Sequence, residues 1–114
     1  MTNPVSVIRH WSSADGSVGQ TLYVWCPGCD MLHGPNVVVL NGPGAVWVWN
    51  GSTEKPTLSP SVLVHSDGRD GSKKCHSYIT EGQWHFLSDC HHALAGQIVD
   101  MVPLPDWIVK ESND

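Results

Sequence analysis

The chain has 114 residues, of which 40% are apolar and 15% are charged. This composition is typical of a globular domain and excludes a disordered chain. The length predicts a single domain over residues 1–114. Eleven acidic residues against six basic ones give a net charge of −5, and only two of the basic residues, Lys73 and Lys74, are adjacent. Because a phosphate-binding surface needs clustered Lys and Arg, this balance disfavours nucleic acid as a partner.

The beginning of the chain, residues 1–4, lacks the basic segment and apolar run of a secretory signal peptide. No stretch reaches the roughly 18 apolar residues of a membrane span. We therefore expect a cytoplasmic protein with no membrane partner. In a reducing cytoplasm, cysteines are more often metal ligands or free thiols than disulfides.

Most apolar runs are short, rich in β-branched or aromatic residues, and closed by Gly, Pro, Asn or Asp. This pattern predicts β-strands. The expected strands cover residues 5–9, 21–25, 36–40, 45–50, 61–65, 75–80 and 83–88. Residues 41–44 are expected to join two strands as a hairpin loop, residues 66–74 to form a loop, and residues 103–107 to form an extended tail with Trp107 anchored. The predicted fold is mostly β, a small antiparallel β-sandwich or partly open barrel with at most one short helical turn, at residues 91–95.

The four cysteines are the most specific chemical signal in the chain. Cys26 and Cys29 are separated by two residues, with Gly28 in the turn, and this spacing allows two thiolates to bind one tetrahedral metal ion. The other two, Cys75 and Cys90, flank a predicted hairpin. A bound Zn²⁺ that stabilises the β domain is therefore the expected cofactor.

The register of this hairpin predicts which side chains share a face. With Glu81-Gly82 as a two-residue turn, Ser77 lies opposite Phe86. Since side chains alternate along a strand, Cys75 and Cys90 fall on one face as diagonal neighbours, about 7–8 Å apart at Cα. Two thiolates at this separation can close around a zinc ion, so the register predicts that they form a pair of ligands.

Histidines offer alternative ligands, because zinc also accepts imidazole. His33 follows the Cys26–Cys29 pair, His76 follows Cys75, and His92 follows Cys90 by two residues. A mixed ligand shell that includes one of these histidines is therefore an alternative. The sulfur-only shell is favoured because it gives all cysteines one role, and its ligands are Cys26, Cys29, Cys75 and Cys90.

The opposite face of the same hairpin carries His76 and Asp89 as diagonal neighbours. A histidine beside a carboxylate could be a general base held in one tautomer, or it could orient a metal ligand. An exposed polar pair on the solvent side of the sheet is the favoured interpretation. If the chain were an enzyme, its candidate catalytic residues would be His76, Asp89 and His92.

Residues 55–61 contain two prolines and three hydroxyl side chains. Each proline removes a hydrogen-bond donor from a strand, so this segment is predicted to be an edge or a shaped loop. A rigid connector is favoured over a segment that supplies hydroxyl groups to a small-molecule pocket. No serine lies in the nucleophile elbow of hydrolases.

Several motifs together resemble those of a family of small bacteriophage and prophage proteins of unknown function. They are Cys26-Pro27-Gly28-Cys29 with His33, Trp49-Asn50-Gly51, the segment 56–61, Cys75-His76-Ser77-Tyr78-Ile79, and the segment 86–96. The resemblance implies a phage-encoded protein in the cytoplasm of the host bacterium, and it implies no reaction. Such proteins are sometimes labelled ammonia monooxygenase, which this chain does not fit, because it has no membrane span and its thiols suit zinc.

The function predicted from the sequence is therefore that of a zinc-binding protein that acts by binding a host or phage protein rather than as an enzyme. The acidic balance, the six tryptophans and a sulfur-only shell favour it, because such a shell leaves no coordination position for water. The alternative is a zinc-dependent hydrolase or small-molecule enzyme, in which zinc keeps three protein ligands and a water.

Overall fold

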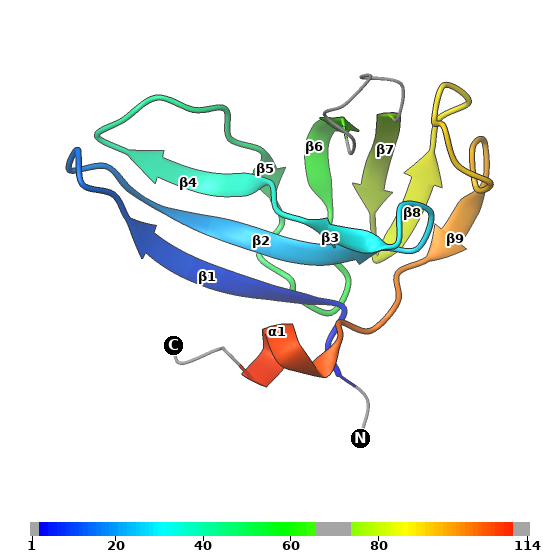
Figure 1. The fold of residues 1–114 in the computed structure, drawn as a ribbon, viewed down its shortest axis with the longest axis horizontal. Helices are drawn as coiled ribbons and strands as arrows, with labels where there is room; N and C mark the ends of the chain where they lie inside the picture. Colours follow the sequence, from blue (N-terminus) through cyan, green and yellow to red (C-terminus); the bar gives the residue numbers. More distant parts are fainter. Residues whose placement is uncertain (1–2, 66–73, 111–114) are drawn as a thin grey trace.

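A computed structural model describes residues 3–65 and 74–110 (Figure 1). The described part forms β-strands followed by one short helix. The elements are β1 (Ser6–Ser12), β2 (Val18–Cys26), β3 (Met31–His33), β4 (Asn36–Leu40), β5 (Val48–Trp49), β6 (Leu58–His65), β7 (Lys74–Thr80), β8 (Gln83–Phe86), β9 (Ile98–Asp100) and α1 (Asp106–Lys110). No helix in this part of the chain has the length and apolar character needed to cross a membrane.

The strands form two antiparallel sheets. In the first, β2 pairs with β1 on one edge and with both β3 and β4 on the other. The second has the strand order β5-β6-β7-β8-β9. Figure 1 shows β6, β7 and β8 running across the direction of β1 and β2. This arrangement confirms the predicted mostly-β fold with two antiparallel sheets, and the described strands do not close into a barrel.

The core joins the two sheets. Leu22 and Val24 of β2 are buried in one cluster with side chains of β7 and β8. The predicted hairpin register is confirmed, since Ser77 pairs with Phe86 across the turn. The predicted alternation also holds within β7 and β8, because the face that carries Cys75 is buried. Its buried members are Cys75, Ser77, Ile79, Trp84 and Phe86.

Some local predictions are wrong. Residues 41–44 do not close a hairpin, because β4 pairs with the long strand β2 and β5 belongs to the other sheet. Residues 91–95 form isolated turns instead of a helical turn. The helix begins within the tail that was predicted to be extended. Asp106 lies in its first turn, where the negative carboxylate interacts favourably with the positive end of the helix dipole. Trp107 in this helix is 53% exposed instead of anchored. Of the predicted loop 66–74, residues 66–73 lie outside the described residues.

Candidate active site and metal centre

Ser61 lies in a β-bulge of β6. Residues 59–61 of β6 stand opposite Tyr78 of β7, because the register shifts between Leu58 and Val62. A bulge re-aims the side chains of a strand, and bulges occur often beside active sites. The indole N–H of Trp47 stabilises the bulge by donating a hydrogen bond to the backbone carbonyl of Ser61 at 3.1 Å.

Three polar side chains form a continuous chain of contacts at this bulge. The hydroxyl Oγ of Ser61 lies 2.9 Å from Nε2 of His76. Nδ1 of the same ring lies 3.2 Å from Oδ2 of Asp89. If Nδ1–H donates to the carboxylate, Nε2 is left to accept the hydroxyl proton. This is the relation of nucleophile, general base and orienting carboxylate that defines a serine-hydrolase triad by geometry.

Backbone hydrogen bonds position the carboxylate of this triad. The N–H of Leu87 donates to the carbonyl of His76 at 2.9 Å, and the N–H of His91 donates to the carbonyl of Lys74 at 2.8 Å. Both ends of the segment that carries Asp89 are therefore tied to β7. Nζ of Lys74 lies 3.1 Å from the same Oδ2. The contacts with Lys74 and then with His76 lower the pKa of Asp89, which favours the ionised carboxylate.

The structure places two of the three catalytic candidates from the sequence together. His76 and Asp89 are in contact, whereas the ring of His92 packs edge-on against Phe86 at a centroid distance of 4.6 Å. Sequence reasoning missed Ser61. Its signal was its place in the segment 55–61, where two prolines favoured the interpretation of a rigid connector.

A second cluster of chemically active side chains lies where the two sheets meet. Cys26 ends β2, Cys29 follows in the turn, His33 ends β3 and Cys75 lies near the start of β7. One ligand atom from each lies within 4.8 Å of the others. The sulfurs of Cys26 and Cys75 are 3.7 Å apart, compared with about 3.8 Å between two sulfurs on a tetrahedral zinc ion. No disulfide involves these free thiols, and the cluster can hold a metal ion.

His33 has the hydrogen bonding that a metal ligand needs. Its ring is buried, and Nδ1 lies 3.2 Å from the carbonyl oxygen of Leu32. A proton on Nδ1 can be donated to that carbonyl, which leaves the lone pair on Nε2. Among the described residues, Nε2 is buried and has no hydrogen-bond partner. Because an unpaired buried polar atom is costly, a metal ion in the cluster would account for it.

The sulfurs of the cluster differ in acidity. A hydrogen bond from Cys75 lowers the pKa of Cys26 to about 4. Donating this bond, together with burial, raises the pKa of Cys75. Burial and then the charge on Cys26 raise the pKa of Cys29 to about 11. These pKa values favour a single thiolate in the cluster. A divalent cation would supply the positive charge that stabilises additional thiolates.

Cys90 makes contacts of a different kind. Its Sγ accepts the backbone N–H of His76 at 3.1 Å and donates to the carbonyl of His76 at 3.0 Å. The backbone of His76 therefore occupies this sulfur as both donor and acceptor. Cys90 also lies near Cys75 and His92 in a second group of possible ligands. Nδ1 of His92 accepts the N–H of Leu94 at 3.2 Å, and Nε2 of this ring, like that of His33, is buried without a hydrogen-bond partner among the described residues.

One protein family matches this chain. Its model carries the description "Bacterial ubiquitination-like system serine protease (BubE)" and matches residues 4–87. The matched range contains Ser61, His76 and the four clustered metal-ligand candidates, and Asp89 lies just beyond it. Neither the curated proteins nor the solved structures contain a match to the chain.

The match corrects the function predicted from the sequence. A phage protein of unknown function is not supported, because the matching family is that of a bacterial ubiquitination-like system. A binding role without enzymatic activity is also wrong, because the family is described as a serine protease. The alternative of a zinc-dependent hydrolase is not favoured. The error has a physical origin, since no serine of the chain lies in a nucleophile elbow and Ser61 belongs to the segment that was interpreted as a connector.

Proposed function

Because the chain belongs to the family of bacterial ubiquitination-like system serine proteases (BubE), we propose that it is a serine peptidase with Ser61 as its nucleophile. The observation that carries this proposal is the chain of contacts from Ser61 through His76 to Asp89, at 2.9 and 3.2 Å. Two independent features therefore agree. The family description names the reaction type, and the geometry supplies the residues that such a reaction requires.

Each triad residue has one task in this proposal. Nε2 of His76 takes the hydroxyl proton as Oγ of Ser61 attacks the carbonyl carbon of the scissile peptide bond. The same proton passes to the leaving amine, and an acyl-enzyme ester remains on Ser61. Water then attacks the ester, gives its proton to His76, and releases the acid and the free hydroxyl. Asp89 holds the ring orientation and stabilises the imidazolium that forms twice in this cycle.

The substrate class follows from the family description. We propose that the scissile bond belongs to a polypeptide of the bacterial ubiquitination-like system. We also propose that the enzyme acts in the bacterial cytoplasm. The four free cysteines support this location, because a reducing compartment keeps thiols available for metal binding.

Covalent labelling tests the proposed nucleophile. A fluorophosphonate probe is expected to form one adduct per chain, on Ser61. The probe reacts with an activated serine hydroxyl, and His76 activates this one. Mass spectrometry of the digested protein locates the adduct. Ser59 is the internal control, since it is exposed and lies in the same segment. An unlabelled protein, or equal labelling of Ser59 and Ser61, would contradict the proposed function.

We further propose that the metal is Zn²⁺, and that its ligands are Cys26, Cys29, His33 and Cys75. Three sulfurs and one imidazole nitrogen form a closed tetrahedral shell of the kind used in structural zinc sites. When bound, the ion supplies a crosslink between the sheet of β2 and β3 and the strand β7. Peptide hydrolysis then depends on the triad alone, because a closed shell offers no position for water.

The ligand set makes a sharp prediction for two substitutions. His33→Ala is expected to lose most of the bound zinc, because it removes the only nitrogen ligand of the shell. Cys90→Ser is expected to keep one zinc per chain, because a hydroxyl can replace both hydrogen bonds of the thiol to His76. Elemental analysis of the purified variants measures the metal. Loss of zinc from Cys90→Ser together with full zinc in His33→Ala would instead support the ligand shell of four sulfurs.

A further inference from the structure

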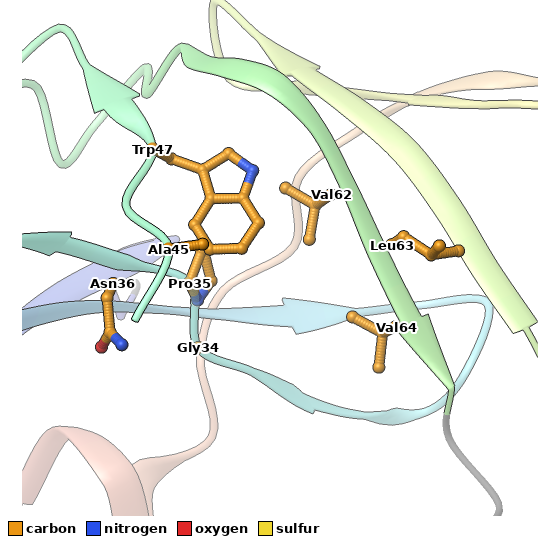
Figure 2. A pocket seen from close by; sticks show the side chains of 8 residues that line it. All are labelled: Gly34, Pro35, Asn36, Ala45, Trp47, Val62, Leu63 and Val64. Atoms are coloured by element: carbon orange, nitrogen blue, oxygen red, sulfur yellow. The ribbon is translucent and has the colours of Figure 1, made fainter. Parts of the chain in front are cut away.

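A cavity of about 460 Å³ lies beside β6 (Figure 2). Figure 2 shows Val62 and Val64 on the side of β6 that faces Trp47 and Pro35, while Leu63 points to the other side of the strand. These side chains give the cavity largely apolar walls. Apolar walls select an apolar guest, because burying its surface is favourable and burying a charge there is not.

The cavity begins next to the proposed nucleophile. Val62, which lines it, follows Ser61 directly in β6. Trp47, which lines it on the opposite side, donates its indole N–H to the carbonyl of Ser61 at 3.1 Å. Since neighbouring side chains of a strand point to opposite faces, the cavity and the hydroxyl of Ser61 lie on opposite faces of β6, one residue apart along the strand.

Among the described residues, the edge of β6 along this cavity carries one pair of backbone groups without a hydrogen-bond partner. The N–H of His76 donates to Cys90, and its carbonyl accepts from Leu87, so both groups point away from β6. The cross-strand pair of His76 and Leu63 is consequently a pair without mutual hydrogen bonds. The N–H and carbonyl of Leu63 then point to the opposite edge, where β5 pairs only with Leu58 and Ser59 among the described residues.

We propose that the polypeptide substrate binds at this edge as an extended segment. In this arrangement, the segment adds a strand to β6, hydrogen-bonds to Leu63, and inserts one large apolar side chain between Trp47 and Val64. This inference rests on the proposed peptidase function and adds its substrate specificity. The occupant is a polypeptide because the free backbone groups, the apolar cavity and the nucleophile follow one another along a single strand. Strand addition uses main-chain bonds for affinity and side-chain pockets for specificity.

The test uses tripeptidyl diphenyl phosphonates, which react covalently with an activated serine. One position at a time carries leucine and the other two carry glycine. In the native protein, leucine at one position is expected to accelerate labelling of Ser61 by about 10- to 100-fold over the all-glycine probe. A labelling rate that is the same for every position would overturn the inference.

Two substitutions locate the binding site. Val64→Trp fills the cavity and is expected to remove the acceleration by leucine, whereas Leu40→Trp, a similar addition on the exposed end of β4, leaves it intact. Leu63→Pro removes the edge N–H and is expected to slow all tripeptidyl probes by about 3- to 10-fold. Leu63→Ala keeps that N–H and is the matched control. Persistence of the full acceleration in Val64→Trp would also overturn the inference.

A fluorophosphonate without a peptide distinguishes failure of the peptidase function from failure of the proposed substrate-binding site at β6. Leu40→Trp should react with it at the native rate, because the probe requires the triad and Leu40 lies outside both the triad and the cavity. If the native protein reacts with neither kind of phosphonate, the peptidase function itself fails. If it reacts with the simple probe but shows no preference for leucine, the function stands and the binding site at β6 is wrong.

Discussion

Ser61→Ala is expected to lower kcat/KM for a fluorogenic peptide amide by about 10⁴-fold or more. The substitution removes the oxygen that attacks the scissile carbonyl. It leaves the backbone carbonyl of Ser61 in place, so the hydrogen bond from Trp47 and the bulge are preserved. The free energy of unfolding, measured by thermal denaturation, should therefore change little while hydrolysis is lost.

Two comparisons make this result specific. Ser59→Ala removes an exposed hydroxyl from the same segment and should retain native activity. His76→Ala should lose about as much activity as Ser61→Ala, and the double variant should lose little more, because the residues of a triad act as one unit. A Ser61→Ala variant with more than a tenth of the native kcat/KM would contradict the assignment of the nucleophile.

The hairpin of β7 and β8 shows how far local rules reach in this chain. A two-residue turn was sufficient to predict that Ser77 pairs with Phe86. The pairing of β4 was not predictable in this way. Its partner β2 lies before it in the chain and offers a long edge, and the loop 41–44 contains no information about that choice.

The two sites differ in what the sequence could reveal. The spacing of Cys26 and Cys29 predicts a metal-binding pair by local geometry, and the strand register brings Asp89 next to His76. Ser61 joins them through the pairing of β6 with β7, a long-range contact that no local residue pattern specifies.

The choice between His33 and Cys90 as a metal ligand also depends on tertiary structure. Both residues lie close enough in sequence to a candidate ligand to be considered. What separates them is the environment of each ligand atom, since Nε2 of His33 is buried without a partner and Sγ of Cys90 is bonded to the backbone of His76. These contacts are long-range, so the spacing of cysteines could not reveal them.

Removal of the metal is expected to unfold the protein. Its proposed ligands come from both sheets, and structural zinc sites contribute about 10–16 kcal/mol of apparent binding free energy, which equals or exceeds the whole stability of a typical domain, about 5–15 kcal/mol. Cys26→Ser, or treatment with a strong chelator, should therefore abolish cooperative thermal unfolding. Circular dichroism measures this loss, and added Zn²⁺ should reverse it for the chelated native chain but not for Cys26→Ser.

The same experiment reports on the triad, because Cys75 and His76 are neighbours on β7. Loss of the ion should free the start of this strand and abolish fluorophosphonate labelling of Ser61 together with the fold. Replacing Zn²⁺ with Cd²⁺, which also prefers sulfur ligands, should restore both the fold and the native labelling rate. A labelling rate that changes with the identity of the ion while the fold is intact would instead mean that the metal takes part in the reaction. Full labelling of the chelated protein would show that the triad forms without the metal crosslink.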